Sequence, residues 1–507
     1  MASSLRAHPR ESRTDADLLI VGGGINGAGI ARDAAGRGLR VVLVEQGDLG
    51  SATSSASSKL VHGGLRYLEH GEVRLVAEAL REREVLLRAA PHIVRPMRFV
   101  LPEEPGQRPA WMIRLGLLLY DFLARRQTLP ASTKVSLAVP PYATGLKTDY
   151  QRGYAYSDCW VDDARLVIAN ARAAHDAGAR IMPRTKFIGA ERHGALWVAR
   201  LHERTGETEV TARALVNAAG PWADRVRELT GYRGAARLRL VQGSHILVPR
   251  LYEGEHAFIL QNEDRRVVFV YPYEGHTLIG TTDVEIDDTP EQCRIGPDET
   301  EYLCRAANRY FSRQADATDV MWSYSGVRAL VDDRAASAAS VTRDYVLQLD
   351  AERPGAPLLS IFGGKITTYR RLAERAVEKL SSFFPDLGSA WTSRVALPGG
   401  DLPDGGMEEY LQILQARYSA LPHGLLTALV HRHGTFTPSV LSGACSVEDM
   451  GEHFGAGLYA REVDYFREHE WARDAQDVLW RRTKAGLHMT PQQQAQVAAY
   501  LQCTHGT

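Results

Sequence analysis

A glycine-rich turn between two apolar strands constrains the fold of this chain more than any other feature. Residues 17–21 (DLLIV) predict a short buried strand, and RVVLVE, which ends at Glu45, predicts a second one. Between them, Gly22, Gly24 and Gly27 follow the spacing G-x-G-x-x-G and begin a segment of helical composition. Strand, glycine turn, helix and strand in this order are typical of a βαβ unit.

The three glycines are typical of a turn that approaches a dinucleotide. The first permits the tight turn, the second lets the backbone approach a pyrophosphate, and the third permits close packing of helix and strand. The helix N-terminus offers N–H groups and a positive dipole end to the phosphates. Glu45 is placed to accept hydrogen bonds from ribose hydroxyls, which favours FAD or NAD over NADP. The alternative is a packing turn without nucleotide, and the glycines alone do not choose between FAD and NAD.

Length, charge and cysteine content exclude several classes of protein. A chain of 507 residues predicts two or three domains. The formal net charge of −1 gives no field that would attract nucleic acid, so no nucleic-acid partner is expected. The five cysteines form no C-x-x-C pair, which argues against a zinc site or a disulfide framework, and no bound metal is expected. No run of about 20 apolar residues predicts a membrane-spanning helix.

The order of strand-like and helix-like segments predicts the organisation of the chain. Residues 1–16 lack an apolar stretch and are expected to be a disordered tail. Residues 180–217 and 240–283 predict two β-rich regions. The passage ALPGGDLPDGG (396–406) is dense in Gly, Pro and Asp and predicts a linker, and residues 407–507 predict a helical domain.

Seven motifs together resemble one known family. They are GGGINGAGIARDAAGRGL, TSSASSKLVHGGLRYLEHGEVRLVAEALREREVLL, YSDCWVDDARLV, NAAGPWAD, GTTDVE, YSGVRAL and FGGKITTYRRLAE. From residue 17 to the C-terminus the chain resembles the aerobic, respiratory FAD-dependent glycerol-3-phosphate dehydrogenases of the D-amino-acid-oxidase-like flavoprotein superfamily. The resemblance implies a mixed α/β (α+β) fold. A discontinuous Rossmann-like FAD-binding domain would lie within residues 17–395, with a β-sheet substrate or cap domain from segments near 95–150 and 235–320, followed by the helical C-terminal domain.

The same resemblance implies an activity and a set of cofactor residues. The expected reaction oxidises sn-glycerol 3-phosphate to dihydroxyacetone phosphate, with hydride transfer from C2 to non-covalently bound FAD and electrons passed to a membrane quinone. The expected cofactor residues are Gly22, Gly23, Gly24, Gly27, Glu45, Ser54, Ser55, Ser58, Lys59, Leu60, Lys186, Ala218, Gly220, Gly363, Gly364, Ile366 and Thr367.

The stretch KLVHGGLRYLEH (59–70) crowds basic and proton-transferring groups just behind a serine-rich segment. The resemblance places His62, Arg66, Arg328 and Lys365 at the substrate, where three cations would suit a phosphate dianion. His62 is the candidate base because histidine exchanges a proton near neutral pH, and Lys365 is the rival. The alternatives are a solvated serine-rich loop and a neutral histidine hydrogen-bonded in a turn.

Residues 108–127 (RPAWMIRLGLLLYDFLARRQ) predict either an in-plane membrane helix or a buried helix of the core or cap domain. The segment is apolar on most sides, with Trp111 near one end, but Arg114 and Asp121 leave too short a run to span a bilayer. The expected location is cytoplasmic, at the inner face of the cytoplasmic membrane. Expected partners are glycerol 3-phosphate, a membrane quinone and a second copy of the chain in a homodimer.

Three other functions stay open on the sequence alone. The first is a glycerol-phosphate oxidase that uses O2. The second is an amine or amino-acid oxidase on the same scaffold, although its carboxylate substrates suit the three cations less well than a phosphate does. The third is a flavin-bearing binding or chaperone module, which would need the cofactor glycines but no substrate cations.

Overall fold

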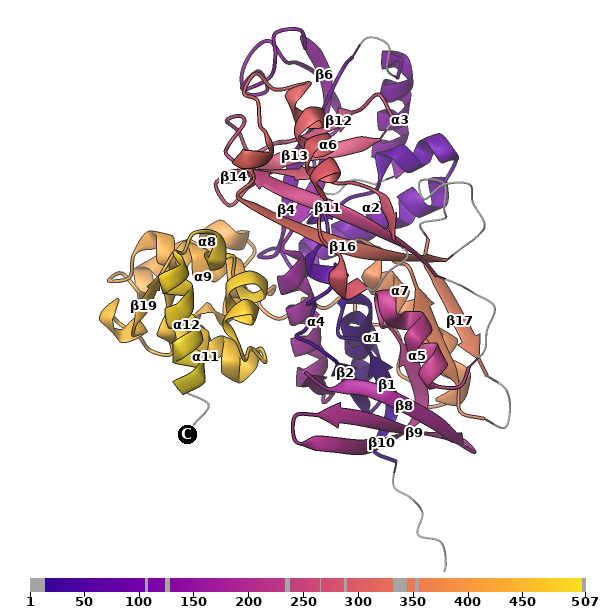
Figure 1. Cartoon of the computed structure of the whole chain (residues 1–507). Coiled ribbons are helices and arrows are strands. Elements are labelled where there is room, and N and C mark those ends of the chain that lie inside the picture. The colour runs from indigo at the N-terminus through magenta and orange to yellow at the C-terminus, as the bar shows by residue number, and fades with distance from the viewer. Residues whose placement is uncertain are drawn as a thin grey trace, which may run out of the picture.

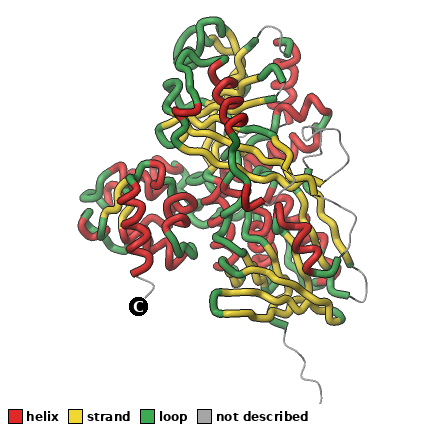
Figure 2. Tube along the Cα trace, in the orientation of Figure 1, coloured by secondary structure: helices red, strands yellow, loops and turns green. Residues whose placement is uncertain are grey.

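Two large sheets and a mostly helical C-terminal unit make up the chain (Figures 1 and 2). The computed structural model describes residues 14–104, 108–123, 128–232, 238–264, 266–286, 290–331, 344–351 and 355–503. In Figure 1 the C-terminal unit lies to the side of the two sheets, next to α4 (Asp163–Asp176). This mixed α/β architecture confirms the predicted fold class.

The first sheet contains the predicted βαβ unit. Its strand order is β17 (Val346–Asp350), β18 (Leu358–Phe362), β10 (Gly206–Asn217), β1 (Ala16–Val21), β2 (Val41–Glu45) and β7 (Arg180–Pro183). All neighbours are parallel except β17, which pairs with β18 in the antiparallel direction. Along β1, Leu18 and Ile20 belong to one core and Leu19 and Val21 to another. Burial on both faces explains why this strand is an unbroken apolar run.

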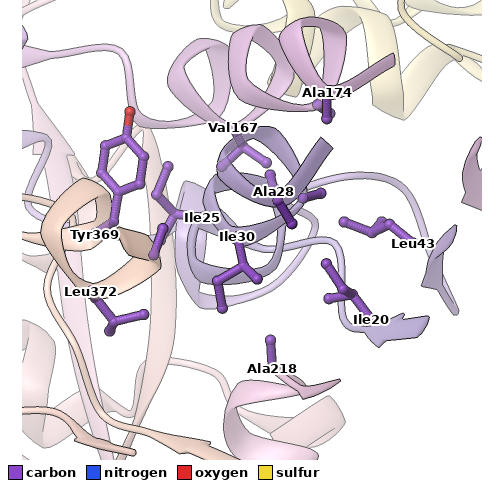
Figure 3. Packing of buried hydrophobic residues seen from close by; sticks show 14 of the residues in the cluster. Ile20, Ile25, Ala28, Ile30, Leu43, Val167, Ala174, Ala218, Tyr369 and Leu372 are labelled. Atoms are coloured by element: carbon purple, nitrogen blue, oxygen red, sulfur yellow. The ribbon is translucent and has the colours of Figure 1, made fainter. Parts of the chain in front are cut away.

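Helices cover one face of the first sheet. They are α1 (Ile25–Gly36), α4 and α7 (Tyr369–Lys379). Figure 3 shows α1 packed between its two neighbours, with Val167 of α4 on one side and Leu372 of α7 on the other. Gly27 makes the tightest contact of the unit, because a Cβ there would lie 1.9 Å from the carbonyl oxygen of Gly22. The third glycine of the motif therefore serves helix–strand packing, as predicted.

The opposite face of the first sheet is covered by a β-meander. β8 (Lys186–His193) pairs with β9 (Leu196–Glu203), which pairs with β10. Trp197 of β9 is buried in the core between the meander and the sheet, and its indole N–H donates to the carbonyl of Pro357 at 2.9 Å. The predicted β-region of residues 180–217 is confirmed, with its first strand, β7, part of the parallel sheet.

The second sheet is mainly antiparallel and forms the cap. Its order is β15 (Val284–Ile286), β11 (Leu238–Val248), β14 (His276–Gly280), β13 (Val267–Tyr273), β12 (Ala257–Gln261), β4 (Val94–Pro102), β6 (Arg152–Val161) and β3 (Leu60–Val61). Two further strands join it, β16 (Trp322–Val331) beside β11 and β5 (Thr133–Ser136) beside β6. Because β3, β6 and β16 lie in this sheet, the cap uses more of the chain than the segments expected near 95–150 and 235–320.

Helices also flank the second sheet. α6 (Pro297–Asn308) packs on one face, and α2 (Val73–Ala89) and α3 (Ala110–Leu123) pack on the other. Strand β12 serves both cores, with Phe258 facing α6 and Ile259 facing the other side. No helix of the described ranges has the length and apolar character needed to cross a bilayer.

The C-terminal unit is built from helices and one short hairpin. Its elements include α8 (Gly406–Arg417), α9 (His423–His433), α10 (Thr437–Leu441), β19 (His453–Gly455), β20 (Leu458–Tyr459), α11 (Ala460–His469) and α12 (Pro491–Cys503). The predicted linker before it is packed rather than loose. The N–H of Leu397 donates to the carbonyl of Ala89 at 2.7 Å, and a Cβ on Gly434 would lie 1.8 Å from the oxygen of Gly399.

The N-terminal boundary of the fold lies earlier than expected. Residues 1–13 of the expected tail lie outside the described residues. Ala16 already belongs to β1, and the carboxylate of Asp15 accepts the N–H of Thr211 at 2.8 Å. The boundary at residue 16 was wrong by about two residues because the strand pairs with β10 before its apolar run begins.

Candidate active site

The predicted cofactor residues gather at the carboxyl edge of the first sheet. Gly22, Ala218 and Gly363 each follow the end of a parallel strand. The N–H of Ala218 donates to Val21 at 2.9 Å, and the side chain of Asn26 donates to the carbonyl of Gly363 at 3.1 Å. Three segments that are far apart in sequence therefore meet at one edge, where open α/β sheets bind their ligands.

The turn after β1 fits a pyrophosphate. Gly22 has a φ of +113°, which L side chains rarely adopt, and a Cβ there would lie 2.5 Å from the oxygen of Ala218. Helix α1 begins after Gly24 with no side-chain cap and no acidic residue in its first turn. The hydroxyl of Ser54 accepts the N–H of Ile25 at 2.9 Å and lies 2.9 Å from a Cβ built on Gly24. A glycine-lined helix start whose own N-cap residue has no side chain attracts an anion.

Glu45 sits where a ribose is expected. Its Oε2 accepts the N–H of Gly23 at 2.7 Å and its Oε1 accepts the N–H of Gly47 at 2.8 Å. Burial raises the pKa of Glu45, and the two N–H groups oppose that rise. Each oxygen keeps a lone pair for a hydroxyl donor. The N–H of Thr185 donates to the Glu45 carbonyl at 2.8 Å, which puts the exposed Lys186 beside this end of the edge.

A buried ion pair fixes the serine-rich stretch SSASS (residues 54–58). The ammonium of Lys59 lies 2.9 Å from Oδ1 of Asp163, and both side chains are almost completely buried. The same ammonium donates to the carbonyl of Ser55 at 2.9 Å, while Asp163 accepts the hydroxyl of Ser57 at 2.8 Å. Burial lowers the pKa of Lys59, and Asp163 opposes that effect. The side chain of Lys59 is thus committed to Asp163, so a contact with the cofactor would come from its backbone.

Residues of the second sheet hold the same stretch from the other side. The hydroxyl of Tyr324 donates to the Ser57 carbonyl at 2.9 Å, and the hydroxyl of Tyr271 donates to the Ser58 carbonyl at 2.6 Å. Nε2 of His245 lies 2.9 Å from the Ser58 hydroxyl. Burial lowers the pKa of His245 well below its ordinary value, so this ring stays neutral. These contacts place the serine-rich stretch in the seam between the two sheets.

Sequence analysis missed Asp163, Tyr271, Tyr324 and His245. Asp163 and Tyr324 lie in motifs that were recognised, YSDCWVDDARLV and YSGVRAL, but nothing in those motifs says which chain segment they contact. Each acts across more than 100 residues of sequence.

Two of the predicted substrate segments meet directly. The N–H of His62 donates to the hydroxyl of Thr367 at 3.2 Å. The ammonium of Lys365 lies 3.7 Å from the ring centroid of Tyr67, the residue after Arg66. The imidazole of His62 also packs edge-on against Phe269 of β13, with ring centroids 5.7 Å apart. The turn that carries His62 and Arg66 and the segment that carries Lys365 therefore lie side by side.

The two glycines after His62 have different reasons to be glycine. Gly64 has a φ of +76° and turns the chain into the 3-10 helix η2 (Leu65–His70). Gly63 is required by packing, because a Cβ there would lie 2.5 Å from Cδ2 of Leu80 and 2.6 Å from the hydroxyl of Tyr120. The bend in the chain after His62 is therefore made by Gly64.

The two predicted arginines differ in their partners. Nε of Arg66 is buried without a hydrogen-bond partner among the described residues. Arg328, on β16, forms an ion pair with Asp283. Its neighbour Ala329 has its carbonyl 3.7 Å from a Cβ built on Gly363, which brings β16 to the FGGK segment. A substrate phosphate would have to share Arg328 with Asp283 or displace that carboxylate.

The remaining predicted residues also lie around this edge. Gly220 has open space where a Cβ would be, Gly364 packs against Leu372, and Ile366 is half-buried against the first core. Leu60 is buried in β3 opposite Trp160. No group of three or more His, Cys, Asp or Glu side chains in the described ranges could hold a metal ion. The glycine-lined backbone, the helix start at Gly24 and Glu45 together fit FAD.

Comparisons with known proteins agree with this geometry. Residues 17–370 match the family described as FAD dependent oxidoreductase, and residues 390–503 match the C-terminal domain of alpha-glycerophosphate oxidase. The chain is 52% identical over 492 residues to glycerol-3-phosphate dehydrogenase of Pseudomonas aeruginosa, covering 96% of this chain and 95% of that protein. It is 49% identical over 483 residues to D-erythritol 1-phosphate dehydrogenase of Brucella abortus, covering 94% and 96%.

A solved structure shares the fold over nearly the whole chain. The glycerol-3-phosphate dehydrogenase of Bacillus halodurans, complexed with FAD, superposes with a TM-score of 0.74 at 26% identity. The match covers 97% of this chain and 95% of that one.

Breaking the ion pair should destabilise the cofactor site. Lys59→Met leaves the Asp163 carboxylate buried and unpaired, which costs about 3–5 kcal/mol. We expect a lower melting temperature and loss of FAD, measured by thermal release of flavin fluorescence. Adding Asp163→Asn removes the unpaired charge, so the double variant should be more stable than Lys59→Met alone. A double variant that melts no later than the single one would show that the ion pair does not govern this stability.

Proposed function

Because the chain belongs to the FAD-dependent oxidoreductase family, we propose that it oxidises sn-glycerol 3-phosphate to dihydroxyacetone phosphate. The observation that carries the proposal is the contact between the turn that holds His62 and Arg66 and the segment that holds Lys365, beside the cofactor edge. A base and two cations next to a hydride acceptor suit an alcohol that carries a phosphate. The match of residues 390–503 to a glycerophosphate-oxidase domain supports the same substrate class.

The cations would bind the phosphate end of the substrate. Arg66 offers a buried Nε that has no partner among the described residues, and a guanidinium pairs with phosphate through charge-assisted hydrogen bonds. Lys365 lies over Tyr67, which fixes the direction of its ammonium. Arg328 would add a third contact in competition with Asp283. Glycerol, which lacks a phosphate, would make none of these charge-assisted contacts.

His62 would remove the proton of the C2 hydroxyl. The chemistry that bound FAD supplies is the acceptance of a hydride from C2. Loss of the hydroxyl proton to His62 completes a two-electron oxidation that leaves a ketone. The hydrogen bond from the His62 N–H to Thr367 ties the base to the FGGK segment on which Lys365 lies. The proposed base, His62, is thus held by the same chain segment that carries Lys365.

A second candidate substrate is D-erythritol 1-phosphate. The relative from Brucella abortus that bears this name is 49% identical to the chain over 94% of its length. Both substrates are polyol phosphates, so the same cations and the same base would serve either one. We commit to glycerol 3-phosphate because the P. aeruginosa relative and the FAD-bound solved structure carry that name.

Helix α3 would bring the enzyme to a membrane that holds its quinone acceptor. Its buried face carries Ile113, Leu117 and Tyr120. Its outer face exposes Trp111, Leu115, Leu118, Leu119 and Phe122, with Trp111 68% and Phe122 80% exposed. A helix with such an outer face, an exposed Arg114 and a Trp near one end suits the plane of a bilayer surface.

The position of α3 also supports a quinone acceptor. Gly116 of this helix faces Leu65 of η2, the segment that carries Arg66 and Tyr67. Arg108, just before this helix, pairs with Glu69 of η2. Arg125 and Arg126 lie outside the described residues. A helix lodged in the bilayer surface would therefore hold the active-site segment next to the lipid phase. Location at the inner face of the cytoplasmic membrane, non-covalent attachment of FAD and the homodimer stay predictions.

Anaerobic mixing with glycerol 3-phosphate should bleach the flavin absorbance of the purified enzyme. D-erythritol 1-phosphate should reduce the flavin with a lower ratio of rate to dissociation constant, and glycerol should reduce it very poorly. A higher ratio for D-erythritol 1-phosphate would reassign the substrate. No bleaching with either phosphate would exclude both substrates, and would leave a flavin-bearing binding module.

After reduction, a soluble quinone should reoxidise the flavin faster than O2 does, with little peroxide formed. Stoichiometric peroxide would indicate an oxidase.

His62→Gln should separate substrate binding from proton transfer. Glutamine keeps hydrogen-bonding capacity but cannot act as a base near neutral pH, so saturated flavin reduction should slow by roughly 10²–10⁴-fold. The dissociation constant of glycerol 3-phosphate should change much less. His70→Gln, at the exposed end of the same segment, is the matched control and should keep the wild-type rate. Full speed in a His62→Gln enzyme with normal FAD content would exclude His62 and leave Lys365 as the base.

Trp111→Ala/Phe122→Ala should weaken membrane binding without loss of stability. Burial of a large apolar side chain contributes about 1.5–3 kcal/mol, so binding to vesicles of anionic phospholipid should fall at least about tenfold. Co-sedimentation measures the binding, and the melting temperature checks the fold. Val395→Ala/Ile413→Ala removes two exposed apolar side chains elsewhere and should bind like wild type. Equal binding by both double variants would place the membrane contact away from α3.

A further inference from the structure

We propose that Tyr120 is a positioning residue for His62, acting together with Asp158 through the backbone of Gly63. The proposal rests on the proposed function, in which His62 is the base. Tyr120 lies on the buried face of α3, and neither it nor Asp158 is among the residues that sequence patterns select for the site. The two side chains instead control the peptide that follows His62.

The hydrogen bonds around Gly63 define the arrangement. Its N–H donates to the hydroxyl oxygen of Tyr120 at 2.8 Å. The Tyr120 hydroxyl donates in turn to Oδ2 of Asp158 at 2.7 Å. Since the phenolic hydrogen is directed at the carboxylate, an oxygen lone pair is left to face the Gly63 N–H. Oδ1 of Asp158 lies 3.4 Å from the same N–H, too far to hold it well by itself.

Asp158 is itself held rigidly. Arg83 of α2 donates to Oδ1 of Asp158 at 2.7 Å and to the carbonyl of Ser157 at 2.8 Å. Arg83, Asp158 and Tyr120 are all buried, with exposed fractions of 1% each. Burial raises the pKa of Asp158, and Arg83 opposes that rise. A buried network with both partners in place is stiff, because any rotation would leave a polar group without a partner.

This network leaves the turn at residues 62–64, the catalytic turn, with little freedom to move. Val61 pairs with Cys159 of β6, the neighbour of Asp158, so the strand before His62 is anchored to the same element. The next two N–H groups are then fixed in succession, His62 to Thr367 at 3.2 Å and Gly63 to Tyr120 at 2.8 Å. The peptide between His62 and Gly63 sets the direction in which the imidazole leaves the backbone. A shift of about 1 Å in such a group can slow a reaction about 100-fold.

Tyr120→Phe tests the proposal because it removes only the hydroxyl. The ring keeps its edge-to-face contact with Tyr156, whose centroid lies 5.6 Å away. We expect the saturated rate of anaerobic flavin reduction by glycerol 3-phosphate to fall about 10–100-fold, with FAD content unchanged. The dissociation constant of the substrate should change less than about threefold, since no phosphate-binding residue is touched.

Tyr156→Phe is the matched control. Tyr156 is as buried as Tyr120 and neighbours the same carboxylate along β6, but in the described parts of the chain its hydroxyl takes no share in the bonds of the turn. This variant should reduce its flavin at close to the wild-type rate. A Tyr156→Phe enzyme as slow as Tyr120→Phe would point to general loosening of the core and would overturn the proposal.

A double variant distinguishes positioning from a separate structural effect. If Tyr120 acts through His62, adding Tyr120→Phe to His62→Gln should slow flavin reduction no further. Additive losses would overturn the proposal, as would a full-speed Tyr120→Phe enzyme beside a slow His62→Gln enzyme. A full-speed His62→Gln enzyme would instead reject His62 as base, and a wild type that the substrate does not reduce would reject the proposed function itself.

Asp158→Asn provides a second test in case Tyr120→Phe fails to fold. Asp158→Asn keeps the size of the side chain but gives the Tyr120 hydroxyl a weaker acceptor. We expect about a tenfold slower reduction, again without further effect in the His62→Gln background. An unchanged rate in Asp158→Asn, with FAD bound, would overturn the role of the pair.

Discussion

The buried ion pair between Lys59 and Asp163 is the interaction on which the site depends. Asp163 begins α4, a helix of the cofactor domain, whereas Lys59 precedes β3, a strand of the cap sheet. The pair therefore ties the two sheets together at the point where the serine-rich stretch passes between them. Neither charge is screened by solvent there, so each is stable only while the other is in place. The hydroxyl and N–H of Ser57 complete the shell of Asp163 and fold the stretch around the pair.

Contacts near this ion pair reach both the cap sheet and the C-terminal unit. On the cap side, Tyr271, Tyr324 and His245 contact the stretch that Lys59 anchors. On the opposite side, Lys484 of the C-terminal unit lies 3.6 Å from Asp162, the residue before Asp163. Arg482 pairs with Asp48 of the loop after β2. The C-terminal unit thus docks through charged contacts onto the start of α4 and the loop after β2, which gives it a structural connection to the cofactor site.

The proposed substrate-binding region is built from half-buried cations and an apolar helix face, and not around one buried ion pair. The cations proposed to bind the substrate come from η2, β16 and the segment after β18. Two of them are oriented by a neighbour, since Tyr67 lies under Lys365 and Asp283 pairs with Arg328. Helix α3 links this region to the surface, since it presents Tyr120 to the catalytic turn and an apolar face to the outside. The proposed function, in which a charged substrate is oxidised and electrons pass to an apolar quinone, would need both kinds of surface close together.

The amino-acid sequence by itself determined the βαβ unit, because spacing of glycines and an unbroken apolar strand are local properties of the backbone. It also marked Gly22, Gly24, Gly27 and Glu45, whose expected roles follow from their place at the ends of predicted strands. It did not determine the partners of Lys59, the pairing of Arg328 with Asp283 or the contact of Tyr120 with Gly63, which join residues 45–104 positions apart. Nor did it choose between a core and a surface role for residues 108–127, because α3 has one buried and one exposed apolar face. Only the tertiary structure decided these points, since hydrophobic periodicity records that a side chain is apolar but not which surface covers it.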